Sequence, residues 1–261
     1  MSAIRLRKYY LDCVTDKGEV VICYASRFSW HTLPINVFSR LICADGKTDQ
    51  CSAMTMRNCL PRIAQPVLRW TCSKAGVIGS WTALRDPIHR VLPVVTRDMI
   101  WHCIQPCSRV FLSQSPAGTL QGMGYAEMIE FTISPWEFDV DEMLWGRFVS
   151  ETDSIVWIEW KGNCAFKLII HNGIEIANGQ VTSSRIDLTA GLALLLNESV
   201  LLRKGSLGET YLASLPLLRP MVPAGVANIF ERKWLSRGRL SRGDVCVSSG
   251  WVVHERVQFR S

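Results

Sequence analysis

The regular spacing of short strand signals constrains this chain more than any other feature of its sequence. Runs of β-branched and aromatic residues recur roughly every ten residues, separated by turn residues. The clearest runs are 20–25, 67–70, 79–84, 109–112, 154–160 and 166–170. The last run precedes His171-Asn172-Gly173, a sequence typical of a hairpin turn. Many evenly spaced strands without alternating helices predict an all-β sandwich or barrel rather than a parallel α/β sheet.

One segment, 188–196, has a pattern compatible with a helix, although a buried strand fits it equally well. The chain of 261 residues is long enough for one large β domain or two small ones. Residues 127–131 and 255–259 share Glu-x-(Ile/Val)-(Glu/Gln)-Phe, which favours two tandem units over a single one, with coincidence as the alternative. We therefore predict an N-terminal β domain over 1–135 and a C-terminal β domain over 136–261.

Two carboxylates are predicted to lie inside the β units. Side chains alternate between the two faces of a strand, so Glu127 shares a face with Tyr125, and Glu255 shares one with Val253 and Val257. Both faces are mainly apolar, and we expect them to point inward. A buried carboxylate must be hydrogen-bonded, neutral or functional, because an unpaired buried charge is too costly.

Composition excludes several functional classes. The net charge of +6 comes from scattered basic residues without a run of five, so we expect no nucleic-acid partner. The basic stretch 236–243 is most simply interpreted as a solvated loop, although weak peripheral contact with an anionic membrane is compatible with it.

We expect a cytoplasmic protein, because the sequence has no secretory signal and its ten cysteines lack disulfide-type or zinc-type spacing. No metal is expected, since His102, Cys103 and Cys107 have no second pair of ligands.

Gly122-Met123-Gly124-Tyr125-Ala126-Glu127 begins like a dinucleotide-binding fingerprint. Its sixth position is Glu instead of Gly, and a strand follows where the motif requires a helix. We therefore expect no nucleotide cofactor, and no cofactor of any other kind.

The same segment belongs to a longer series of tryptophans, glycines and prolines. Trp101 and Pro106 come first, then Gly122-x-Gly124-Tyr125-x-Glu127, and then Trp145-Gly146-Arg147. This series resembles the carotenoid 1,2-hydratase (hydroxyneurosporene synthase) family, in the AttH-like branch of the calycin superfamily, which is also similar to certain fungal pericyclic cyclases. The resemblance is specific between about residues 98 and 160 and weak elsewhere. Glu127 stands where the family has Asp, and the family's histidine corresponds only loosely to His102.

The resemblance implies a calycin or lipocalin-like fold, an apolar isoprenoid ligand, and the addition of water to its terminal double bond. The residues implied for catalysis are Glu127, Tyr125, Trp101 and His102. Those implied for substrate binding are Trp136, Trp145, Arg147 and Trp157.

The residue types suit this chemistry independently of the family. Hydration of an isolated alkene requires an acid that protonates carbon, and aromatic faces stabilise the resulting cation. A carboxylic acid in an apolar pocket can keep its proton near neutrality. Three alternatives stay open at this point: Glu127 paired with Arg147 as a structural clamp, a pericyclic or cyclising enzyme, and a non-catalytic carrier of a hydrophobic ligand.

Overall fold

The computed structural model describes residues 4–30, 33–93, 99–114, 118–131, 139–189, 191–213, 215 and 222–259. In this part of the chain, the 3-10 turn η1 (Ser73–Ala75) and the short helix α1 (Ala224–Ala227) are the helical elements, and strands make up most of the rest. The prediction of an all-β protein with two calycin-like units is confirmed. None of the described helical segments is long and apolar enough to cross a membrane.

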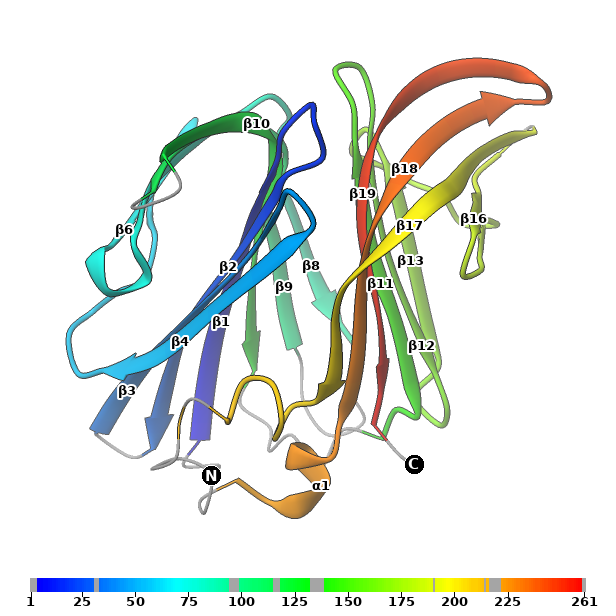
Figure 1. The fold of residues 1–261 in the computed structure, drawn as a ribbon. Helices are drawn as coiled ribbons and strands as arrows, with labels where there is room; N and C mark the ends of the chain where they lie inside the picture. Colours follow the sequence, from blue (N-terminus) through cyan, green and yellow to red (C-terminus); the bar gives the residue numbers. More distant parts are fainter. Residues whose placement is uncertain are drawn as a thin grey trace. The chain divides into compact units, whose positions relative to one another are not determined.

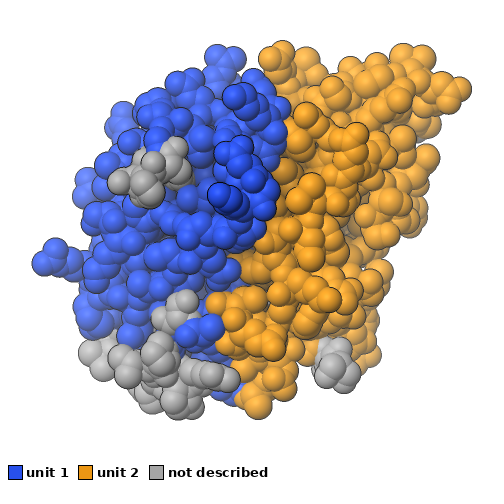
Figure 2. All heavy atoms as spheres, viewed as in Figure 1, with its two compact units in different colours: residues 1–138, 211–223 blue, residues 139–210, 224–261 orange. Residues whose placement is uncertain are grey.

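The chain forms two compact units, coloured separately in Figure 2. Unit 1 comprises Met1–Phe138 and Tyr211–Pro223, and unit 2 comprises Asp139–Thr210 and Ala224–Ser261. The predicted boundary at residues 135 and 136 lies outside the described residues.

Unit 1 contains a single ten-stranded antiparallel sheet that curls around its core (Figure 1). Its strands are β1 (Ile4–Val14), β2 (Val20–Trp30), β3 (Leu33–Ala44), β4 (Lys47–Thr55), β5 (Arg62–Ala64), β6 (Val67–Cys72), β7 (Val77–Ala83), β8 (Ile88–Leu92), β9 (Met99–Gln114) and β10 (Gly118–Phe131). Their order is β4-β3-β2-β1-β10-β9-β7-β6-β5, with β8 paired to β9. The first strand of the unit therefore lies beside its last.

Unit 2 repeats this arrangement with nine strands. They are β11 (Glu142–Val149), β12 (Ser154–Lys161), β13 (Phe166–His171), β14 (Ile174–Glu175), β15 (Gln180–Val181), β16 (Arg185–Asp187), β17 (Leu192–Ser206), β18 (Phe230–Arg242) and β19 (Val245–Gln258). Their order is β14-β13-β12-β11-β19-β18-β17-β16-β15, so β11 and β19 correspond to β1 and β10. The ambiguous segment 188–196 enters β17 and is a strand where it is regular.

Each sheet has a hydrophobic core on one face. In unit 1 the core includes Leu11, Trp70, Trp81 and Ala126, and in unit 2 it includes Phe148, Trp157, Leu240 and Val252. Because side chains alternate along a strand, the neighbours of these residues point to the opposite face of each sheet.

Candidate functional site

The face of β10 that carries Glu127 is not the face that carries the core. Ala126 belongs to the core of unit 1 and Met128 packs against it, so Tyr125 and Glu127 project from the other side of the sheet. Tyr125 is nevertheless fully buried and Glu127 is 5% exposed. The predicted burial is thus correct, whereas the predicted inward direction is wrong. Glu255 in β19 is only partly buried, and it too projects from the face opposite Val252, which belongs to the core of unit 2.

Two neutral donors hold the carboxylate of Glu127. The indole Nε1 of Trp101 donates to Glu127 Oε2 at 2.6 Å, and the hydroxyl of Tyr125 donates to the same oxygen at 2.7 Å. Trp101 comes from β9, where Ile129 is its cross-strand partner, while Tyr125 and Glu127 lie on β10. Three of the residues predicted to act together therefore form one hydrogen-bonded group.

The thiol of Cys103 extends this group along β9. Cys103 lies opposite Glu127 in the strand register, and its thiol is hydrogen-bonded to the Tyr125 hydroxyl. Burial, with Cys103 and Glu127 close by, raises the pKa of Tyr125 well above its ordinary value. Burial likewise raises the pKa of Cys103. Both groups therefore keep their protons at neutral pH, and Tyr125 stays a donor to Glu127.

A second carboxylate lies on the same face of the sheet, and the sequence analysis missed it. Asp12 lies on β1 and is completely buried, and Tyr125 is its cross-strand partner. Its Oδ2 accepts a hydrogen bond of 2.8 Å from the Tyr10 hydroxyl. Tyr10 in turn is the cross-strand partner of Glu127. The alternation in Tyr9-Tyr10-Leu11-Asp12 was the available signal, because it places Tyr10 and Asp12 on one face.

Aromatic rings surround these carboxylates. The ring of Tyr10 meets Tyr24 edge-on at 5.4 Å between centroids and Tyr125 at 6.0 Å, and Tyr24 meets Tyr211 at 5.4 Å. We call the residues of this face the tyrosine–carboxylate cluster: Tyr10, Asp12, Tyr24, Trp101, Cys103, Tyr125 and Glu127. It combines buried acids, phenolic donors and aromatic surfaces, which are the groups needed for proton transfer to an apolar molecule.

The structure does not bring His102 together with Glu127. His102 lies between Trp101 and Cys103 on β9 and therefore points to the opposite face. Its ring meets His89 at 5.6 Å, and burial together with His89 lowers its pKa. Among the described residues, no group of three His, Cys, Asp or Glu side chains is arranged to hold a metal ion.

Three of the four residues predicted to bind substrate belong to unit 2. Trp145 and Trp157 belong to unit 2, where both line a cavity of about 280 Å³. Arg147, also in unit 2, is completely buried and donates to the backbone carbonyl of Trp251 at 3.1 Å. Trp136 lies outside the described residues.

Unit 2 carries buried charges on the face of its sheet opposite its core. Lys233 is fully buried, forms an ion pair with Glu255, and lies 3.8 Å from the carboxylate of Glu231. Glu231 also pairs with Arg203 at 2.7 Å, and the Lys233 ammonium lies 5.5 Å from the ring centre of Trp145. The inward carboxylate predicted at Glu255 is thus satisfied by a partner that sequence reasoning did not identify.

Comparisons with known proteins support the fold but not a specific family. No protein-family model matches the chain, and no curated protein sequence matches it. Among solved structures, the chain is similar to a Nitrosomonas europaea protein assigned provisionally to AttH, with a TM-score of 0.62, 9% identity, and coverage of 99% of this chain and 93% of that one. It is also similar to kievitone hydratase from Nectria haematococca (TM-score 0.56, 9% identity, 97% and 88% coverage). A third similar structure is CghA (TM-score 0.55, 9% identity, 99% and 89% coverage). At this identity the likeness shows a shared fold.

Proposed function

We propose that this protein is a hydratase that adds water to a terminal carbon–carbon double bond of an apolar isoprenoid, with Glu127 as the proton donor. One observation carries the proposal: a buried carboxyl group is fixed by two hydrogen bonds to a single oxygen, from Trp101 and Tyr125. Because Oε2 accepts both bonds, the proton of the neutral acid would be carried on Oε1.

The reaction balances with Glu127 as the sole acid and base. Glu127 gives its proton to the less substituted carbon of the terminal double bond, and the π electrons form the new C–H bond, leaving a tertiary cation on the other carbon. A water molecule then forms the C–O bond and loses a proton to the Glu127 carboxylate, which regenerates the acid. The product is a tertiary alcohol.

The surroundings of Glu127 suit this sequence of steps. Trp101, Tyr125 and Tyr10 provide aromatic surface near the carboxyl group, and such surface stabilises a carbocation. Tyr125 remains a neutral phenol because burial raises its pKa, so it keeps the carboxyl group oriented in both protonation states. The scaffold is similar to that of kievitone hydratase and is therefore compatible with a hydratase.

The decisive test uses an acyclic carotenoid or squalene as substrate with the full-length protein. We expect a tertiary alcohol as product and, in D2O, one deuterium on the carbon that received the proton. Glu127→Gln should lower the turnover number at least about 100-fold, because general acid catalysis typically contributes that much. Ligand binding should persist, since glutamine keeps the shape of the side chain.

Glu130→Gln is the matched control for this experiment. Glu130 lies on the same strand, but it forms ion pairs with Arg5 and Arg7 instead of contacting the cluster. It should therefore retain wild-type turnover. If Glu127→Gln hydrates as fast as the wild type, the mechanism is wrong. Cyclisation that survives this substitution would indicate a pericyclic enzyme, and recovery of unchanged bound ligand would indicate a carrier.

A further inference from the structure

Unit 2 contains a cavity that the proposed hydration does not use. All its lining residues belong to unit 2, and its volume is about 280 Å³. Leu144, Trp157 and Leu196 contribute to the lining and to the hydrophobic core, so the cavity adjoins the core inside the curled sheet. Trp234 and His254, from the long β18–β19 hairpin, add an aromatic wall.

A chain of hydrogen bonds leads from the cavity into the sheet. Ser199 is exposed and lines the cavity, and its hydroxyl lies 2.7 Å from that of Ser236. Ser236 is fully buried, and its oxygen lies 2.9 Å from Nε2 of His254. The imidazole stacks on Trp234 at 5.3 Å with 19° between the planes. The wall therefore offers a hydroxyl whose orientation is fixed by two further polar groups.

The charges around the cavity leave a positive side chain in its lining. Arg256 is paired with Glu142, and Glu255 is paired with Lys233. Burial, followed by the nearby Lys233, lowers the pKa of His254 to about 4, so its imidazole is neutral at physiological pH.

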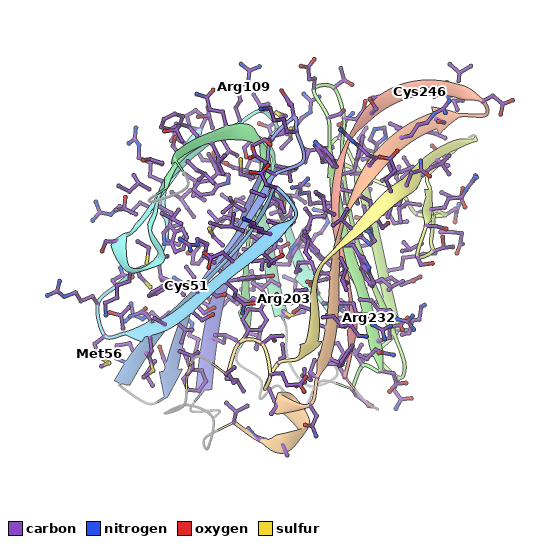
Figure 3. All side chains as sticks on the ribbon, viewed as in Figure 1. Cys51, Met56, Arg109, Arg203, Arg232 and Cys246 are labelled. Atoms are coloured by element: carbon purple, nitrogen blue, oxygen red, sulfur yellow. The ribbon has the colours of Figure 1, made fainter. Side chains whose placement is uncertain are left out.

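Arg232, on β18 (Figure 3), lies with its guanidinium 5.3 Å from the ring centre of Phe230, and no ion pair is found for it among the described residues.

We propose that this cavity binds a small aromatic carboxylate, with its ring against Trp157 and Trp234, its carboxylate on Arg232, and a hydrogen bond to Ser199. Tryptophan faces favour flat aromatic groups, and an arginine guanidinium matches the fork geometry of a carboxylate. A cationic ligand would be repelled by Arg232. The volume lies near the lower end of small-molecule sites, which suits one or two rings and not a long polyene.

Calorimetry with 2-naphthoate and its neutral counterpart 2-naphthamide tests this proposal on the full-length protein at pH 7.5. We expect 2-naphthoate to bind about tenfold or more tightly than the amide, because hydrogen bonds to charged groups are stronger than neutral ones. Arg232→Met should reduce this preference to twofold or less. Ser199→Ala should weaken binding of the carboxylate several-fold without removing the preference.

Arg239→Met is the matched control, because Arg239 is an exposed arginine on the same strand that contacts the carbonyl of Asp244. It should leave both affinities unchanged. Glu127→Gln should also bind 2-naphthoate like the wild type, so failure of the hydratase proposal would not affect this result. Equal affinity for acid and amide in the wild type, or no binding of either at millimolar concentration, would overturn the proposal. The wild-type comparison decides the matter even if Arg232→Met does not fold.

Discussion

The imidazole of His254 is enclosed by the stacked ring of Trp234 and by the hydroxyl of Ser236. A charged imidazole would lose hydration there and would also be repelled by Lys233, and the pKa of His254 falls to about 4 for these reasons. In the unfolded chain the same group titrates near its ordinary value of about 6.5. Between these two values the unfolded state binds more protons than the folded state.

The free energy of unfolding should therefore decrease as the pH falls from about 6.5 towards 4, and His254 should have no such effect above that range. Between pH 7.5 and 4.5 we expect His254 to account for about 2–3 kcal/mol of lost stability. Urea unfolding across this range measures the effect. His254→Asn should remove that part of the pH dependence, whereas substitution of the exposed His89 should leave it in place.

At the scale of single residues, strand alternation was the most useful sequence signal. It correctly grouped Tyr125 with Glu127, and the grouping of Trp101 with both came from the family-like spacing. It could not tell which face of β10 would pack on the core, because both faces are buried. Asp12 was missed because its neighbour Tyr125 lies more than 100 residues away in the sequence and becomes adjacent only through the β1–β10 register.

At the scale of the strands, two glycines of β10 lie close to the backbone of β1. A Cβ atom on Gly124 would fall well inside contact distance of the Asp12 carbonyl oxygen, and one on Gly122 would do the same with Val14. The glycines that resembled a nucleotide-binding fingerprint thus permit close packing of two backbones. The absence of a side chain at these positions is required by the sheet itself.

Gly124→Ala should accordingly destabilise the β1–β10 pairing and the tyrosine–carboxylate cluster attached to it. We expect a loss of about 2–4 kcal/mol in the free energy of unfolding, since overpacking against the backbone cannot be relieved by a rotamer change. Gly225→Ala is the control, because a Cβ there meets nothing within 4 Å, and its stability should stay close to the wild type. Equal stability of the two variants in denaturant titrations would contradict this account.

Local elements were more predictable than their partners. The turn at Asn172 and Gly173 joins β13 to β14 with both residues at positive φ (49° and 84°), as the sequence indicated. Pairings such as β1 with β10 and β11 with β19 depend on which edges meet after collapse, and no local pattern encodes that choice.

Over the whole molecule the cysteines are distributed unevenly. All ten are free thiols, and the six buried ones all belong to unit 1: Cys13, Cys23, Cys59, Cys72, Cys103 and Cys107. Burial raises the pKa of Cys23, and it raises the pKa of Cys59 to about 11. Cys246, by contrast, is exposed beside the turn that joins β18 to β19 (Figure 3). Thiol reactivity therefore reports mainly on the integrity of unit 1.

Titration of the native protein with a chromogenic disulfide reagent at pH 8 should show one fast thiol. We expect Cys246→Ser to abolish this phase, because the other thiols are partly or fully buried. The six buried thiols should react only after denaturant unfolds unit 1. Rapid labelling of several thiols in the Cys246→Ser variant would mean that unit 1 opens readily in its native state.

The short sequence echo between residues 127–131 and 255–259 corresponds to a real structural repeat. Glu127 lies in β10, beside the first strand of unit 1, and Glu255 lies in β19, beside the first strand of unit 2. Their cross-strand partners are Tyr10 and Trp145, respectively.

The residues around these two glutamates differ between the units. Asp12 in unit 1 has Arg147 as its counterpart in unit 2, two residues further along each first strand. Five residues were enough to indicate the duplication but not this change of charge.

The pairing of β1 with β10 also sets the timing of folding on the ribosome. Strands β1 to β4 are neighbours in both sequence and space, so they can form a meander as soon as they emerge. The other edge of β1 must wait for β10, where Leu6 meets Phe131. At ordinary rates of translation that wait lasts roughly 6–25 s. During this interval, the unpaired backbone N–H and C=O groups along this edge can pair with a strand of another chain. The nascent chain is therefore most vulnerable to aggregation well before its synthesis ends.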